Sequence, residues 1–183
     1  MTRASERLLT MEGRARRFGD DVNTDYIISS ARKRRTIDVR ALRPFIFESI
    51  APDFAASVRP GDVIVAGRNF GCGSAMEIAV TVLQSAGIAA VVAASFARSF
   101  YRNAINNGLV VLECDTSAIA EGDTLIVRVA ENSSSVQIVD RQVDIPGAPL
   151  PAIMLRILEH GGLVPFLSAQ GGFGPGVLDS RDA

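Results

Sequence analysis

The residues of this chain best suited to chemistry lie at positions 67–77, in the run Gly-Arg-Asn-Phe-Gly-Cys-Gly-Ser-Ala-Met-Glu. Glycine has no side chain, so backbone N–H groups in such a loop approach an anion closely. A helix that begins after the loop adds partial positive charge at its N-terminus. The segment therefore predicts a seat for a phosphate or a carboxylate, with Gly71, Cys72 and Gly73 as backbone donors and Ser74 beside the anion.

Several readings of this loop compete. A nucleotide-hydrolysing P-loop would end in Gly-Lys-Ser or Gly-Lys-Thr, and a dinucleotide fingerprint would read G-x-G-x-x-G; neither is present. A nucleophilic serine or cysteine needs a nearby base, and the single histidine, His160, is remote in sequence. A tight turn that only precedes a helix, with Cys72 as a small buried residue, stays open as the structural alternative.

The elements around the loop predict how it is positioned. Residues 62–66 form an apolar strand before it, and residues 75–86 have the apolar spacing of a helix. Residues 89–94 are wholly apolar, which is typical of a parallel strand buried on both faces. A second helix over 95–107 and a strand over 109–112 complete a parallel βαβ core.

The flanking segments predict less regular structure. We expect a short strand within residues 13–18, a β-prone run over 26–28, and an antiparallel hairpin from the alternating segments 123–130 and 135–143. A short helix is expected over 152–160. The fold class is therefore α/β, with a flexible lead over residues 1–10, one domain over 11–167 and a disordered tail over 168–183.

Composition excludes several classes of protein. The 183 residues carry a net charge of −1, which gives no electrostatic basis for binding nucleic acid or an anionic membrane. No apolar run reaches the roughly 20 residues that span a bilayer, and no signal peptide is evident. Two distant cysteines, Cys72 and Cys114, predict neither a disulfide framework nor a metal cluster on this chain. Free thiols fit the cytoplasm.

Four collinear segments resemble the small subunit of 3-isopropylmalate dehydratase, the swivel domain of the aconitase superfamily. The resemblance covers roughly residues 12–165. It is carried by Asn23-Thr24-Asp25-Tyr26-Ile27, by the strand and loop over 59–74, by the strand over 86–93, and by Ser95-Phe96-Ala97-Arg98-Ser99-Phe100-Tyr101-Arg102-Asn103 with the Asn-Asn-Gly that follows.

The resemblance implies a three-layer β/β/α fold and a division of labour between two subunits. A large partner subunit would carry a 4Fe-4S cluster, and this chain would bind no cofactor of its own. The reaction would be reversible hydration or dehydration of isopropylmalate or another small hydroxy dicarboxylic acid. By the same resemblance Ser74 would be the catalytic base and Asp25 an acidic residue of the active site.

The chain departs from the family pattern within the loop itself. The family reads Gly-Ser-Ser-Arg-Glu, whereas this chain has Ala75 and Met76 after Ser74. Methionine cannot replace the two-pronged grip of arginine on a carboxylate. We therefore expect a cation from the basic run after Asp25, Arg32 or Arg34, to bind substrate together with Gly71, Cys72, Gly73 and Ala75. The alternative is a non-catalytic anion-binding module that has lost hydratase activity.

Overall fold

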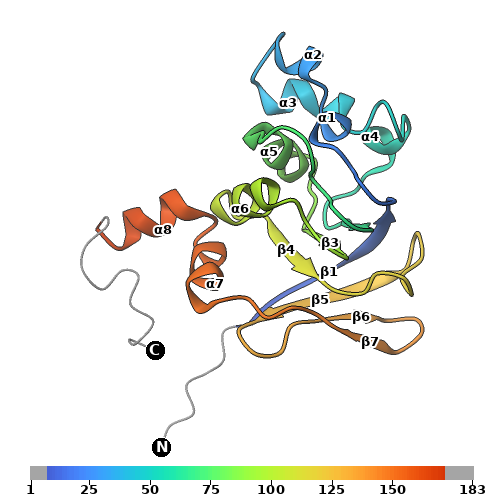
Figure 1. Cartoon of the computed structure of the whole chain (residues 1–183), viewed down its shortest axis with the longest axis vertical. Coiled ribbons are helices and arrows are strands. Elements are labelled where there is room, and N and C mark those ends of the chain that lie inside the picture. Colours follow the sequence, from blue (N-terminus) through green and yellow to red (C-terminus); the bar gives the residue numbers. More distant parts are fainter. Residues whose placement is uncertain (1–7, 172–183) are drawn as a thin grey trace, which may run out of the picture.

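The computed structural model describes residues 8–171. One seven-stranded mixed sheet organises them, in the order β4-β3-β2-β1-β5-β6-β7 (Figure 1). The central strand β1 (Leu8–Arg17) pairs with β2 in parallel near its C-terminal end and with β5 antiparallel over the rest of its length. Because one long strand pairs with different neighbours at its two ends, the sheet curls and divides into two halves around β1.

The parallel half confirms the βαβ core predicted from the sequence. Its other strands are β2 (Val63–Ala66), β3 (Ala90–Ala93) and β4 (Val110–Glu113), and all residues of β2 and β3 are buried. Parallel neighbours need a crossover connection. The helices α5 (Glu77–Ser85) and α6 (Arg98–Asn106) supply it here. Burial on both faces explains why these strands are continuous apolar runs.

The antiparallel half is a meander of β5 (Thr124–Ala130), β6 (Ser135–Ile138) and β7 (Val143–Pro146). The predicted hairpin corresponds to β5 and β6. The sequence did not predict β7, which is mostly exposed and ends in Pro146. An edge strand of this kind tolerates proline and carries little alternating signal.

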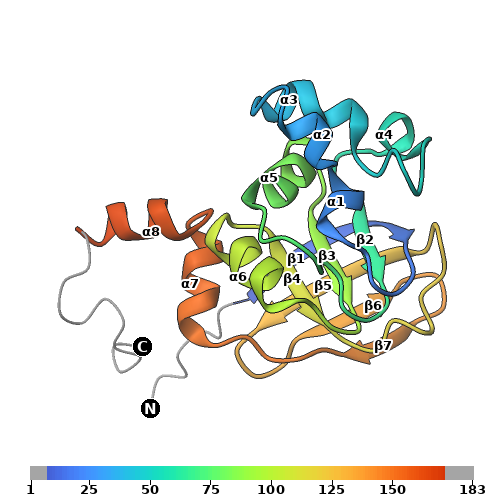
Figure 2. The same ribbon diagram turned by 45° about the horizontal axis from the view of Figure 1, so that its top comes forward.

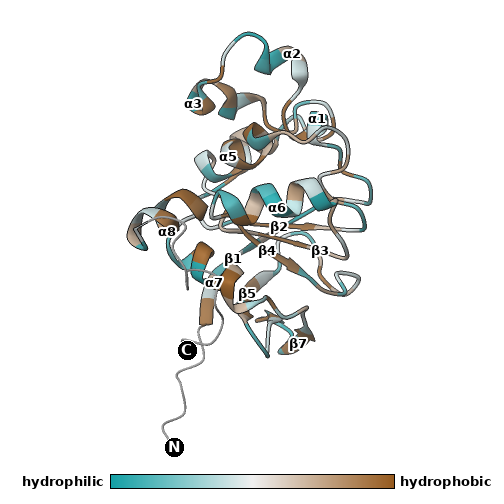
Figure 3. Ribbon diagram, turned by 60° about the vertical axis from the view of Figure 1, so that its left-hand side comes forward, coloured by the Kyte–Doolittle hydropathy of each residue, from teal (hydrophilic) through white to brown (hydrophobic). Residues whose placement is uncertain are grey.

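The two halves and the helices form three layers. Figure 2 shows α5 and α6 above the parallel strands and the β5–β7 meander below them. Figure 3 shows the strands β2–β4, coloured brown where they are apolar, between these layers. Their residues are buried, apart from the half-buried Glu113 at the end of β4. The predicted β/β/α fold class is confirmed.

Two boundaries differ from the sequence prediction. Residues 8–10 belong to β1 and not to a flexible lead, because Leu8 and Thr10 pair with β5 along the sheet. At the other end, α7 (Ala152–Glu159) is followed by an unpredicted helix, α8 (Leu163–Ala169). The predicted tail therefore begins inside α8, and its residues 172–183 lie outside the described range, as do residues 1–7.

Within residues 8–171, no single helix has the length and apolar character to cross a membrane. Only α7 and α8 taken together, across a bend of 90°, reach such a composition.

The crossover from β1 to β2 carries short helices that lie beyond the helical layer at the top of Figure 1. They are α1 (Thr24–Ile27), α2 (Ser30–Lys33), α3 (Val39–Leu42), the 3-10 turn η1 (Arg43–Phe45) and α4 (Phe54–Ser57). The β-prone run over 26–28 was predicted wrongly, since residues 26 and 27 are helical. The Asn23 side chain accepts a hydrogen bond from the Asp25 N–H at 2.8 Å and caps this turn.

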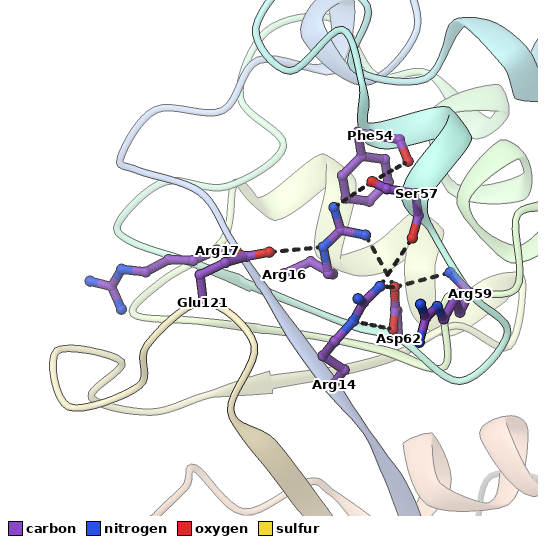
Figure 4. A network of polar contacts seen from close by, with 8 residues as sticks. All are labelled: Arg14, Arg16, Arg17, Phe54, Ser57, Arg59, Asp62 and Glu121. Carbon is purple, nitrogen blue, oxygen red and sulfur yellow. Dashed lines mark hydrogen bonds and ion pairs between the residues drawn. The ribbon is translucent and has the colours of Figure 1, made fainter.

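A buried ion-pair network fastens the start of β2 to β1. Asp62 is 2% exposed, and its carboxylate accepts hydrogen bonds from Arg14 at 2.8 Å and Arg16 at 3.2 Å (Figure 4). The Arg59 N–H donates to the same carboxylate at 3.0 Å, and the Arg16 guanidinium lies 4.6 Å from the centre of the Phe54 ring. This network holds the start of β2 against β1, and β2 then leads into the glycine loop.

Candidate active site

The glycine loop after β2 is held between two neighbouring chain segments. Phe70 forms a parallel bridge with Phe96 on one side, and Cys72 forms one with Asn23 on the other. The Thr24 N–H donates to the Cys72 carbonyl at 2.8 Å. The structure thus brings the 23–25 segment and the 71–76 loop together at the carboxyl ends of the parallel strands, where open α/β sheets bind ligands.

Glycine is required at two positions of this loop. Gly71 and Gly73 have φ values of +78° and +93°, a region that residues with a side chain rarely adopt. A Cβ atom on Gly71 would lie 2.2 Å from Phe100 Cγ, and one on Gly73 would lie 2.5 Å from Asn23 Oδ1. The loop therefore depends on glycine for close packing as well as for conformation.

A Gly71→Ala substitution is expected to lower the free energy of unfolding by about 3 kcal/mol. We assign about 1 kcal/mol to the positive φ and about 2 kcal/mol to overpacking against Phe100, which is buried in a cluster with Phe70 and Phe96. Chemical denaturation of the wild type, of Gly71→Ala and of a control variant measures the free energy of unfolding. Gly122→Ala is the matched control, because Gly122 has φ +85° and no atom near its Cβ position. Equal losses in the two variants would contradict the packing contribution.

Ser74 lies on the exposed surface at the end of the loop, two residues before Met76, which occupies the N-cap position of α5. Its carbonyl accepts a hydrogen bond from Thr24 Oγ1 at 2.9 Å. Within residues 8–171, Ser74 Oγ has no hydrogen-bond partner. The backbone of Ser74 is thus held in place, while its hydroxyl is available to bind a ligand. Ala75, the next residue, is also exposed.

Asp25 is half-buried and its carboxylate faces α2. Asp25 Oδ1 accepts hydrogen bonds from Ser30 Oγ at 2.7 Å and from the Ser30 N–H at 2.9 Å. These two bonds, with smaller contributions from Lys33 and Arg34, hold the pKa of Asp25 below its usual range. Asp25 is therefore an ionised carboxylate at neutral pH that orders the start of α2.

Two groups of the predicted site, the Gly71 amide and the Arg32 guanidinium, form hydrogen bonds within the chain. The Gly71 N–H donates to the Val22 carbonyl at 2.8 Å, and the bond closes the loop against the 22–24 segment. Arg32 forms a two-pronged ion pair with Glu48, at 3.0 and 2.8 Å, and its guanidinium lies 3.7 Å from the centre of the Phe45 ring. Both groups therefore have partners within the chain, and their roles in substrate binding stay predictions. Arg34 is exposed beside this region.

A contact that the sequence prediction missed joins the basic run to the loop. Lys33 Nζ lies 3.3 Å from Met76 Sδ, at the start of α5. Thr24 was also not predicted as a site residue, although its hydroxyl fixes Ser74. The only sequence signals were the positions of Lys33 in the basic run and of Thr24 beside Asp25.

The described cysteines and acidic side chains do not form a metal centre. Burial, with a smaller effect of Asp21, raises the pKa of Cys72, so its side chain is a thiol and not a thiolate at neutral pH. Across residues 8–171, no three His, Cys, Asp or Glu side chains gather as a metal site requires.

Known proteins are similar to this chain in sequence. The family model of the aconitase C-terminal domain matches residues 50–117. The 3-isopropylmalate dehydratase small subunit of Halothermothrix orenii is 44% identical over 158 residues, which are 85% of this chain and 94% of that protein. The isopropylmalate/citramalate isomerase small subunit of Methanocaldococcus jannaschii is 44% identical over 162 residues, covering 87% and 95% of the two chains.

A solved structure agrees with these relatives. The crystal structure of 3-isopropylmalate dehydratase from Methanocaldococcus jannaschii superposes with a TM-score of 0.82 at 40% identity, covering 89% of this chain and 96% of that one. Sequence identity at this level, over nearly the full length and with the same fold, establishes common descent. The chain belongs to the family of 3-isopropylmalate dehydratase small subunits, within the aconitase superfamily.

Proposed function

We propose that this chain is the small subunit of a two-subunit hydro-lyase. It acts on isopropylmalate, as a step of leucine biosynthesis, or on a related substituted malate. The observation that carries the proposal is the position of Ser74: a free hydroxyl on a glycine loop at the carboxyl ends of the parallel strands, in a chain that matches small subunits over most of its length. The relatives do not favour the alternative of a non-catalytic module, which Ala75 and Met76 had suggested.

In the proposed reaction Ser74 Oγ takes the proton from the carbon beside the hydroxyl-bearing carbon. The electron pair of that C–H bond forms the new double bond, and the hydroxyl leaves as hydroxide with the electron pair of the C–O bond. This hydroxide and the proton taken by Ser74 together make the water that is released, which returns Ser74 to its starting state. Serine is a weak base, so the step requires a site that stabilises its alkoxide. The amides of Cys72 and Gly73 and the positive end of α5 supply that stabilisation once the partner excludes water.

The partner is a large subunit that carries a 4Fe-4S cluster. When bound, this cluster supplies a Lewis acid for the departing hydroxyl and for a substrate carboxylate. This chain contributes the ionised carboxylate of Asp25 and an anion seat formed by the loop. Cys72 and Cys114 are both free thiols, and burial raises the pKa of Cys114 to about 12. Free thiols suit a reducing compartment, so we propose that the complex is cytoplasmic.

Reconstitution tests the proposal directly. The full chain is assembled with the cluster-loaded large subunit from its own organism and assayed on 2-isopropylmalate, citramalate and other substituted malates, with formation of the unsaturated acid followed by absorbance. We expect turnover of at least one malate only when both subunits are present, because Ser74 and the cluster lie on different chains. The large subunit alone is the control. A loaded complex that turned over none of these acids would refute the proposed activity.

A further inference from the structure

The chain contains a single lysine among its 19 basic residues, Lys33, and all the others are arginine. Lys33 is the last residue of α2 and is half-buried, whereas the neighbouring Arg34 and Arg35 are exposed. An ammonium group is a compact charge on a flexible stem and forms single, movable hydrogen bonds, unlike the rigid fork of arginine. The one lysine of the chain lies against the loop that carries Ser74.

The partner of this ammonium is a weak one. Lys33 Nζ lies 3.3 Å from Met76 Sδ, and a thioether accepts hydrogen bonds poorly. Met76 itself is 4% exposed, so the group that the ammonium meets belongs to a buried apolar side chain. Within residues 8–171, no carboxylate lies within ion-pair distance of Lys33. Most of the hydrogen-bonding capacity of the ammonium is therefore available to a ligand.

The surroundings favour an anionic ligand at this position. Asp25 is the nearby carboxylate, but its hydrogen bonds come from Ser30, so it orders α2 and attracts Lys33 only weakly, without a direct ion pair. Arg32 is neutralised by Glu48. Two residues before Met76, Ser74 presents its free hydroxyl. A negative group bound between Ser74 and Lys33 would satisfy the ammonium and lie next to the proposed base.

We infer that Lys33 binds one carboxylate of the substrate and selects dicarboxylic over monocarboxylic hydroxy acids. The inference rests on the proposed function for the identity of the substrate. Lys33 performs the anchoring that the sequence prediction gave to Arg32 or Arg34. Because Lys33 binds the acid equally before and during proton removal, it contributes to substrate affinity and not to the chemical step.

Kinetics of the assembled complex separate this role from that of Ser74. Lys33→Met keeps the stem and removes the charge, and it should raise KM for the dicarboxylate about 10- to 100-fold, the loss expected for a charge-assisted hydrogen bond. kcat should stay within about threefold, and KM for the monoamide of the same acid should hardly change. KM of the Lys33→Arg variant for the dicarboxylate should lie between those of the wild type and of Lys33→Met. The control is Arg40→Met, an exposed cation of α3, which should leave KM within about twofold of the wild type. A KM within about twofold of the wild type for Lys33→Met would overturn the inference.

A second measurement does not depend on turnover. Reductive ¹³C-methylation labels only Lys33 and the N-terminal amine of this chain and keeps both charges. The labelled chain is assembled with unlabelled large subunit and titrated with 2-isopropylmalate, with malonate as a second dicarboxylate. We expect the Lys33 resonance alone to shift. If the wild-type complex turns over no malate but this shift is seen, the proposed activity fails while the carboxylate site stands. Resonances unchanged by both acids would refute the site.

Discussion

Replacing Ser74 by alanine is expected to lower kcat of the assembled hydro-lyase by about a thousandfold, within the 10²- to 10⁴-fold range of a lost general base. KM should change little, because Ser74 Oγ acts on the reacting C–H bond while other groups hold the carboxylates. The backbone of Ser74 is fixed through its carbonyl by Thr24, so alanine should leave the loop in place. Steady-state assays of the reconstituted complex measure both constants.

The control for this variant is Ser168→Ala. Ser168 is an exposed residue of α8, a helix apart from the loop, and its hydroxyl bonds only within that helix. Both variants should show the unfolding midpoint of the wild type, which separates loss of chemistry from loss of structure. Hydratase activity unchanged in Ser74→Ala would remove Ser74 from the mechanism and return the loop to a purely binding role.

The second large effect is on stability. Asp62→Ala is expected to lower the free energy of unfolding by about 4 kcal/mol, because it leaves Arg14 and the largely buried Arg16 without their shared carboxylate. For a chain of this size, a loss of about 4 kcal/mol lowers Tm by roughly 10 °C. Asp144→Asn is the matched control, since Asp144 is exposed and 3.9 Å from Arg128; it should cost less than about 0.5 kcal/mol.

The contribution of Asp62 to stability should also depend on pH. Burial alone would raise the pKa of Asp62, but hydrogen bonds from Arg14, Arg59 and Arg16 outweigh it and hold that pKa below its usual value of 3.8. The carboxylate therefore stabilises the fold fully above about pH 4 and loses that effect as pH falls through the lowered pKa. The stability difference between wild type and Asp62→Ala should narrow below about pH 4. A difference independent of pH there would assign the loss to packing instead.

The parallel core was predictable because its signals are local. Strands buried on both faces must be continuous apolar runs, and 62–66, 89–94 and 109–112 are such runs, separated by segments with helical spacing. The glycine loop was predictable for a similar reason, since Gly71 and Gly73 adopt a backbone conformation that other residues avoid. Strand β7 and helix α8 were missed because each is short and largely exposed, so neither has a strong periodic pattern.

The contacts of the individual charged side chains could not be predicted from the sequence in this way. The sequence by itself determined the fold class and the loop that carries Ser74, which follow from residue types at short spacing, and the family, which follows from four collinear segments. Only the tertiary structure decided that Arg32 pairs with Glu48, that the Gly71 amide bonds to Val22, and that Lys33 meets Met76. Each of those contacts joins residues 16 to 49 positions apart, and local patterns do not record which side chains the folded backbone brings within hydrogen-bond distance.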